Sequence, residues 1–104
     1  MISVVIPNFN KSNFLVDTII SLKSQTFKNW EAIIVDDFST DNSIELISNY
    51  VKNDKRFIVF ENKSNRGGSF CRNYGLTKAK GDYVFFLDSD DILSTNCLED
   101  RFKI

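Results

Sequence analysis

Four short apolar runs, separated by longer mixed segments, constrain the fold of this chain more than any other feature. They are ISVVIP at 2–7, EAIIVDD at 31–37, RFIVFE at 56–61 and DYVFFLD at 82–88. None of them alternates polar with apolar residues. That pattern is typical of strands covered on both faces, as in a parallel sheet.

The segments between these runs carry apolar residues at helical spacing. We expect helices at about 13–25, 41–53 and 68–79, and a fourth that begins near Thr95 and continues to the end of the chain. Ser12 or Asn13 is the candidate N-cap of the first helix. Thr40 or Asp41 is the candidate for the second. Strict alternation of strand and helix predicts an α/β fold with a mainly parallel, doubly wound sheet.

Composition excludes several classes of protein. With 104 residues, 42% hydrophobic and 26% charged, the chain has the make-up of one globular domain or part of one. A net charge of −1 with interspersed signs argues against a nucleic-acid partner. No run approaches the roughly 18 apolar residues of a membrane span, and the start lacks a basic leader. We therefore expect a cytoplasmic protein, and leave open a peripheral membrane association of a longer form.

Residue types also limit the chemistry. Histidine is absent, which removes the commonest general base near neutral pH and the commonest transition-metal ligand. Cys71 and Cys97 lack metal-ligand spacing, and we interpret them as reduced structural thiols. Chemistry must therefore rest on carboxylates, amides, Arg, Lys or an added metal ion.

Polar clusters follow each apolar run, where an open parallel sheet binds its ligands. They are PNFN at 7–10, DDFS at 36–39, the segment 62–68 and DSDD at 88–91. Two of these carry adjacent carboxylates, which repel one another unless a cation joins them. Oxygen ligands without His or Cys select Mg²⁺ or Mn²⁺, and Mg²⁺ usually completes its shell with phosphates. The sequence therefore favours a cation site for a phosphorylated ligand.

Simpler interpretations exist for each cluster. DSDD and DDFSTDNS would also serve as helix caps and turns, although their occurrence at two ends of one sheet favours a site. Phe9 and Phe38 are either ordinary loop aromatics or stacking surfaces for a planar base. Residues 65–68, NRGG, are a weak candidate for an anion cradle, because they match neither the Walker A nor the GxGxxG pattern.

Arg72 in the third predicted helix has three open interpretations. It is a solvated surface charge, a partner of Asp36 or Asp37, or a ligand of a phosphate.

Four ordered motifs resemble the N-terminal half of family 2 glycosyltransferases, which have the Rossmann-like GT-A fold. The motifs are VVIPNFN at 4–10, SQTFKNWEAIIVDDFSTDNS at 24–43, NRGGSFCRNYGL at 65–76 and GDYVFFLDSDDIL at 81–93. The resemblance implies transfer of a sugar, with inversion, from a nucleotide sugar to a hydroxyl of a saccharide or lipid-linked acceptor. It favours UDP over dTDP or GDP, and Mg²⁺ or Mn²⁺ as cofactor.

The resemblance also implies roles for nucleotide-binding residues. Pro7 and Phe9 would lie against the base, and Asp37 would accept a hydrogen bond from its ring N–H. Arg72 matches the Arg of the family's A-R-N segment, although Cys71 replaces the usual Ala.

The D-x-D motif carries the implied metal ligands. Asp90 would bind the metal at the diphosphate, and Asp88 would face the ribose or the metal. Asp91 would neighbour the sugar or cap the last helix. Phe38 stands where Gly is more usual, which should alter that loop without removing Asp37.

The family's catalytic base lies well downstream of D-x-D, so the resemblance places it beyond Ile104. Glu99 and Asp100 do not match it. Attack by a hydroxyl needs such a base. We expect residues 1–104 to be the donor-binding half, without the acceptor half and inactive alone. A bare sheet edge should then favour self-association.

Four other classes of protein remain as alternatives. A nucleotidyltransferase would carry a Gly-rich basic loop where PNFNKSN stands. A receiver-like domain needs its acid pair after the first strand, and so does a phosphatase using Asp88 as nucleophile. A non-catalytic nucleotide-binding module is the remaining alternative.

Overall fold

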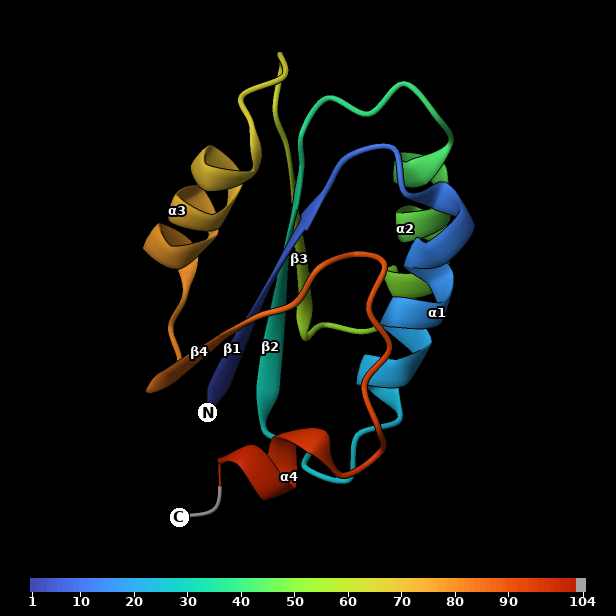
Figure 1. Cartoon of the computed structure of the whole chain (residues 1–104). Helices are drawn as coiled ribbons and strands as arrows, with labels where there is room; N and C mark the ends of the chain where they lie inside the picture. Colours follow the sequence, from blue (N-terminus) through green and yellow to red (C-terminus); the bar gives the residue numbers. More distant parts are fainter. Residues whose placement is uncertain (103–104) are drawn as a thin grey trace.

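A computed structural model describes residues 1–102 as a twisted, entirely parallel sheet between two layers of helices (Figure 1). The strands are β1 (Ile2–Asn8), β2 (Trp30–Asp36), β3 (Phe57–Glu61) and β4 (Tyr83–Phe86). Their order is β3-β2-β1-β4, and Ile2 of β1 lies opposite Trp30 on one side and Tyr83 on the other. The predicted α/β, doubly wound parallel sheet is confirmed.

The helices are α1 (Ser12–Lys23), α2 (Ser43–Val51), α3 (Gly68–Lys78) and α4 (Cys97–Arg101). Helices α1 and α2 cover one face of the sheet, and α3 covers the other (Figure 1). Val4 and Ile34 therefore point into the larger core with Ile19, while Val5 and Ile33 pack toward α3. Because both faces are covered, these strands carry apolar residues at consecutive positions.

Asp41 organises the start of both α1 and α2. Neither Ser12 nor Asn13 is the N-cap of α1, because Lys11 occupies that position without a side-chain bond. Instead, Asp41 accepts the backbone N–H of Ser12 at 3.0 Å and that of Ser43, the first residue of α2, also at 3.0 Å. Burial raises the pKa of Asp41, but hydrogen bonds from Ser43 and Ser12 outweigh it, and the pKa is lowered.

The expectation that the last helix continues to the end of the chain is wrong. Helix α4 ends at Arg101, and Phe102 leaves helical geometry with φ −111° and ψ 39°. The Phe102 ring packs against Tyr83 and Phe85 of β4, with centroids 5.5 and 6.2 Å apart. Residues 103–104 lie outside the described part.

The order of the strands in the sheet determines where a ligand can bind. Strand order reverses at β1, because the chain goes from β1 outward through β2 to β3 and then returns to the opposite side of β1 as β4. The loops after β1 and β4 both run toward α1 (Figure 1), and a crevice lies at the carboxyl ends of these strands, beside α3. In residues 1–102, no helix has the length and apolar character needed to cross a bilayer.

Candidate functional site

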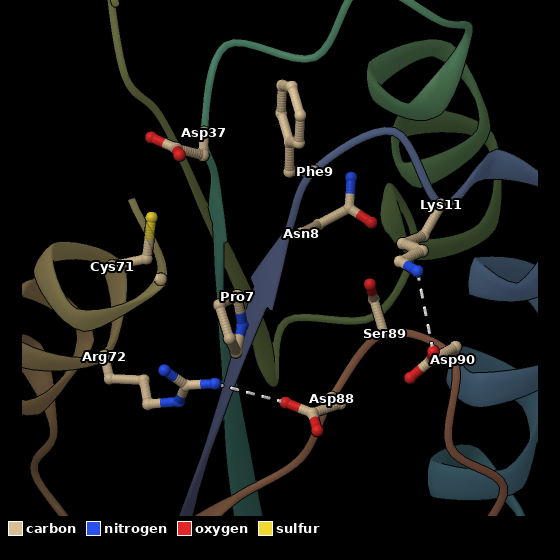
Figure 2. Close-up of a pocket in the computed structure, with 11 residues that line it drawn as sticks. Pro7, Asn8, Phe9, Lys11, Asp37, Cys71, Arg72, Asp88, Ser89 and Asp90 are labelled. Atoms are coloured by element: carbon tan, nitrogen blue, oxygen red, sulfur yellow. Dashed lines mark ion pairs between the residues drawn. The ribbon is translucent and has the colours of Figure 1, made fainter. Parts of the chain in front are cut away.

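A cavity of about 320 Å³ occupies this crevice (Figure 2). Its lining residues are Pro7, Asn8, Phe9, Lys11, Asp37, Gly68, Cys71, Arg72, Asp88, Ser89 and Asp90. The residues to which the resemblance assigned nucleotide or metal binding are among them, namely Pro7, Phe9, Asp37, Arg72, Asp88 and Asp90, whereas Phe38 and Asp91 are not. The structure thus brings these side chains together, while their individual roles stay predictions.

Asp37 is held at one end of the cavity by three N–H donors. Its Oδ1 accepts the backbone N–H of Arg66 at 2.7 Å and Nδ2 of Asn62 at 3.0 Å, and its Oδ2 accepts the N–H of Gly67 at 2.9 Å. Burial raises the pKa of Asp37, but these bonds outweigh it and lower the pKa. The carboxylate is ionised at neutral pH, and Oδ2 keeps lone-pair capacity for a further donor.

The same bonds correct the expectation for residues 65–68. The amides of Arg66 and Gly67 do bind an anion, but it is the carboxylate of Asp37. Gly67 reaches this position with φ 92°, a conformation that favours glycine. The NRGG segment therefore orients Asp37 and does not offer these two amides to a phosphate.

Asp36 ties the loops after β1 and β2 together. It accepts Nδ2 of Asn8 at 2.8 Å, and the backbone N–H and hydroxyl of Ser39 at 3.0 and 2.6 Å. The residue is buried and lies outside the cavity lining. Asp36 is therefore structural, and Asp37 lies at the other end of the cavity from the D-x-D loop (Figure 2).

The D-x-D loop carries a cluster that fits a hard cation. Asp88, Asp90 and Asp91 are exposed, and each offers a carboxylate oxygen within 4.8 Å of the others. Two Mg²⁺ ligands lie at most about 4.2 Å apart, twice the bond length, so a small side-chain rotation completes the fit. The N–H of Asp91 donates to the carbonyl of Asp88 at 3.0 Å, which closes a turn. Asp91 does not cap α4, which begins only at Cys97.

Two cations flank this cluster in the structure. Arg72 Nη2 lies 3.6 Å from Asp88 Oδ1, and Lys11 Nζ lies 3.7 Å from Asp90 Oδ2 (Figure 2). Arg72 thus faces the cavity and pairs with Asp88 instead of Asp36 or Asp37. Both pairs are partly exposed, and such pairs contribute about 0–1 kcal/mol, so a stronger ligand can replace them. Sequence reasoning missed Lys11, whose position just after the end of β1 was the available signal.

Cys71 lies beneath Asp37 and is chemically inert. Burial and the nearby charge of Asp37 raise the pKa of the thiol to about 11. A neutral thiol is a poor nucleophile. Cys71 and Cys97 are both free, and the structural interpretation of Cys71 agrees with its burial in the smaller core.

An open parallel sheet with a cavity at its switch point, a buried acid at one end and a D-x-D loop at the other fits the GT-A class of folds. Residues 3–103 match the family model described as glycosyl transferase family 2. The chain therefore belongs to glycosyltransferase family 2.

Curated relatives support this membership. An uncharacterized glycosyltransferase of Haemophilus influenzae is 44% identical over 99% of this chain and 41% of its own length. The poly(ribitol-phosphate) β-N-acetylglucosaminyltransferase TarP of Staphylococcus aureus is 45% identical over 98% of this chain and 32% of its own length. The chain thus spans well under half the length of these relatives.

Solved structures show the same fold. Staphylococcus aureus TarS in complex with UDP-GlcNAc superposes with a TM-score of 0.89 and 33% identity, covering 96% of this chain and 29% of that one. A Pyrobaculum calidifontis mannosyltransferase with GDP-Man and Mn²⁺ has a TM-score of 0.82 at 21% identity, covering 88% of this chain and 28% of that one. The second likeness supports the fold alone.

Proposed function

We propose that this chain binds the nucleotide-sugar donor of an inverting glycosyltransferase that acts on a hydroxyl acceptor. The observation that carries the proposal is a cavity with Asp37 at one end and Asp88 and Asp90 at the other. A nucleotide sugar has a matching polarity, with a base that donates a ring N–H and a diphosphate that is strongly anionic.

At the Asp37 end, the base lies against Pro7 and the half-exposed ring of Phe9 and donates its ring N–H to Asp37. The three donors that orient this carboxylate are already in place, so binding requires little rearrangement. The solved complexes of TarS with UDP and with UDP-GlcNAc favour a UDP sugar here.

At the other end, Asp88 and Asp90 would hold Mg²⁺ or Mn²⁺ for the diphosphate. When bound, such an ion neutralises charge that develops on the leaving group. Arg72 exchanges its contact with Asp88 for a phosphate oxygen, which it binds more strongly in a bidentate pair. Lys11, which pairs with Asp90 in the structure, would give up that contact to a bound cation.

The acceptor hydroxyl needs a carboxylate base. The carboxylates that line the cavity are Asp37, Asp88 and Asp90, and each already has a task at the donor. Glu99 lies on α4, at the opposite end of the sheet, where it accepts the hydroxyl of Thr26 at 2.6 Å (Figure 1). We expect residues 1–104 to act as the donor-binding half, which binds a donor without transferring its sugar.

Calorimetric titration with UDP, in the presence and absence of Mn²⁺, tests the proposal. The wild type should bind UDP more tightly with Mn²⁺, and Asp90→Ala should lose about tenfold or more of the Mn²⁺-dependent affinity. Asp17→Ala is the matched control, because it removes an equal charge from the exposed face of α1 and should titrate like wild type. A wild type that binds no UDP under either condition would refute the proposal.

A further inference from the structure

Two polar side chains on the buried side of α1, and a third just after its C-terminal end, lie where packing against a sheet alone would call for apolar residues. Thr18 and Gln25 are completely buried, and Ser21 nearly so. All three bond to the backbone of the segment that follows Asp88, although they are far from it in sequence. Burying polar groups is unfavourable unless they find partners, so their presence here indicates a specific task.

Thr18 holds the peptide at the centre of the D-x-D motif. Its Oγ1 donates to the carbonyl oxygen of Ser89 at 2.9 Å, and it lies 3.4 Å from the carbonyl of Phe14. A hydroxyl has one hydrogen, so the shorter contact to Ser89 takes it. Ser89 is buried, while Asp88 and Asp90 on either side of it are exposed to the cavity. A single bond from α1 thus fixes the backbone between two candidate ligands.

Ser21 and Gln25 anchor the remainder of the loop. Ser21 Oγ accepts the N–H of Leu93 at 3.1 Å. Gln25 Nε2 donates to the carbonyl of Ser94 at 2.7 Å, and Gln25 Oε1 accepts the N–H of Leu98 at 3.0 Å. The loop therefore runs along α1 with its backbone bonded at several successive points.

We propose that Thr18 is a positioning residue for the cation site, with Ser21 and Gln25 extending its action along the loop. This inference rests on the proposed function, because it assumes that Asp88 and Asp90 hold the cation. Without the Thr18 hydroxyl, the buried carbonyl of Ser89 loses its partner and turns toward water to regain one. That movement changes the separation of the two carboxylates and weakens cation binding, although neither carboxylate is altered.

Thr18→Val and Thr18→Ser separate this role from general packing. Valine matches the shape of threonine but lacks the hydroxyl, whereas serine keeps it. We expect Thr18→Val to lose about tenfold in Mn²⁺-dependent UDP affinity, as for other partners that orient metal ligands. Its UDP affinity without Mn²⁺ should be unchanged, because the Asp37 end of the cavity is untouched. Thr18→Ser should bind Mn²⁺ and UDP within about twofold of wild type.

Two further variants test whether the loss of affinity comes from the loop contacts and not from lower stability. Ile47→Ala removes buried volume on α2, away from the loop, and controls for a loss of stability. It should keep the full Mn²⁺ response. Ser21→Ala is milder than Thr18→Val and favours the helix, so it provides a test if Thr18→Val does not fold. We expect it to lose part of the Mn²⁺-dependent affinity, because the N–H of Leu93 loses its acceptor while the bond from Thr18 to Ser89 remains.

The outcomes distinguish the two proposals. If the wild type binds UDP no more tightly with Mn²⁺ than without it, both the proposed function and this inference are contradicted. A normal wild-type response that Thr18→Val shares overturns only the role of Thr18. The role of Thr18 is also overturned if Ile47→Ala or Thr18→Ser loses as much Mn²⁺-dependent UDP affinity as Thr18→Val does. If Thr18→Val does not fold, a Ser21→Ala variant with the full Mn²⁺-dependent affinity overturns it instead.

Discussion

At the scale of single residues, the loop that carries Asp37 contains backbone strain. Phe38 adopts φ 61°, a left-handed conformation that costs a non-glycine residue about 1–2 kcal/mol, and its ring is 52% exposed. Phe38→Gly should therefore leave the free energy of unfolding within about 1 kcal/mol of wild type or raise it, because relief of strain offsets the added chain entropy. Phe38→Val should lower it by about 1–2 kcal/mol, because β-branching disfavours this conformation. Urea unfolding of both variants provides the measurement, and a Phe38→Gly variant less stable than Phe38→Val would contradict it.

The sequence predicted the site residues that belong to a motif. It did not predict those whose place in the site depends on tertiary contacts. The motifs pointed to Asp37, Asp88 and Asp90, which the structure places around one cavity. The donors that bind Asp37 and the contact between Lys11 and Asp90 join segments that only the folded sheet brings together. No spacing along the chain reveals such contacts.

At the scale of secondary-structure elements, α3 packs against the sheet through Gly75. A Cβ at this position would lie 2.4 Å from Cγ1 of Val5 on β1, closer than two carbon atoms can approach. Gly75→Ala should therefore lower the free energy of unfolding by about 1–3 kcal/mol, since overpacking forces the helix away from the sheet. Val5→Ala removes the opposing methyl groups, so the double variant should be more stable than the two single losses predict. Additive losses in urea unfolding would show that the two residues do not compete for the same space.

The strands and helices were largely predictable from the sequence, because runs of consecutive apolar residues indicate strands covered on both faces. All four predicted strands and four predicted helices are present. The end of α4 was not readable, because it depends on the packing of Phe102 against β4. The capping of α1 by Asp41 likewise required the folded arrangement of two loops.

At the scale of the whole molecule, hydrogen-bonded acids make stability dependent on pH. Burial raises the pKa values of Asp37 and Asp41, but their hydrogen bonds outweigh it, and both are lowered from 3.8. For Asp54, the hydrogen bond from Arg56 is the largest cause of a lowered pKa. A lowered pKa adds stability that is complete above the unfolded value and is lost as pH falls through the folded value.

The free energy of unfolding should therefore change little from these groups above about pH 5 and decline below pH 3.8. Urea unfolding between pH 7 and pH 3 measures this decline. Asp37→Asn should reduce its steepness, because the amide cannot titrate. A free energy of unfolding that rises as the pH falls from 7 to 3 would contradict this prediction.

The outer edge of the sheet gives a further prediction at this scale. Tyr83 and Phe86 of the edge strand β4 are 44% and 47% exposed. An apolar, unpaired strand edge favours association with another strand. The isolated chain should therefore show a concentration-dependent increase in mass by light scattering, which Phe86→Lys should reduce. A strictly monomeric chain at high concentration would contradict this expectation.

The central claim is that one cavity binds a nucleotide by its base at Asp37 and by its diphosphate, through a cation, at Asp88 and Asp90. Amide-resolved NMR titration tests it most directly. UDP alone should shift the amide signals of Arg66 and Gly67, which bond to Asp37, and Mn²⁺ added with UDP should broaden the signals of residues 88–91. Shifts by UDP remote from Asp37, or broadening by Mn²⁺ that spares residues 88–91, would contradict the account.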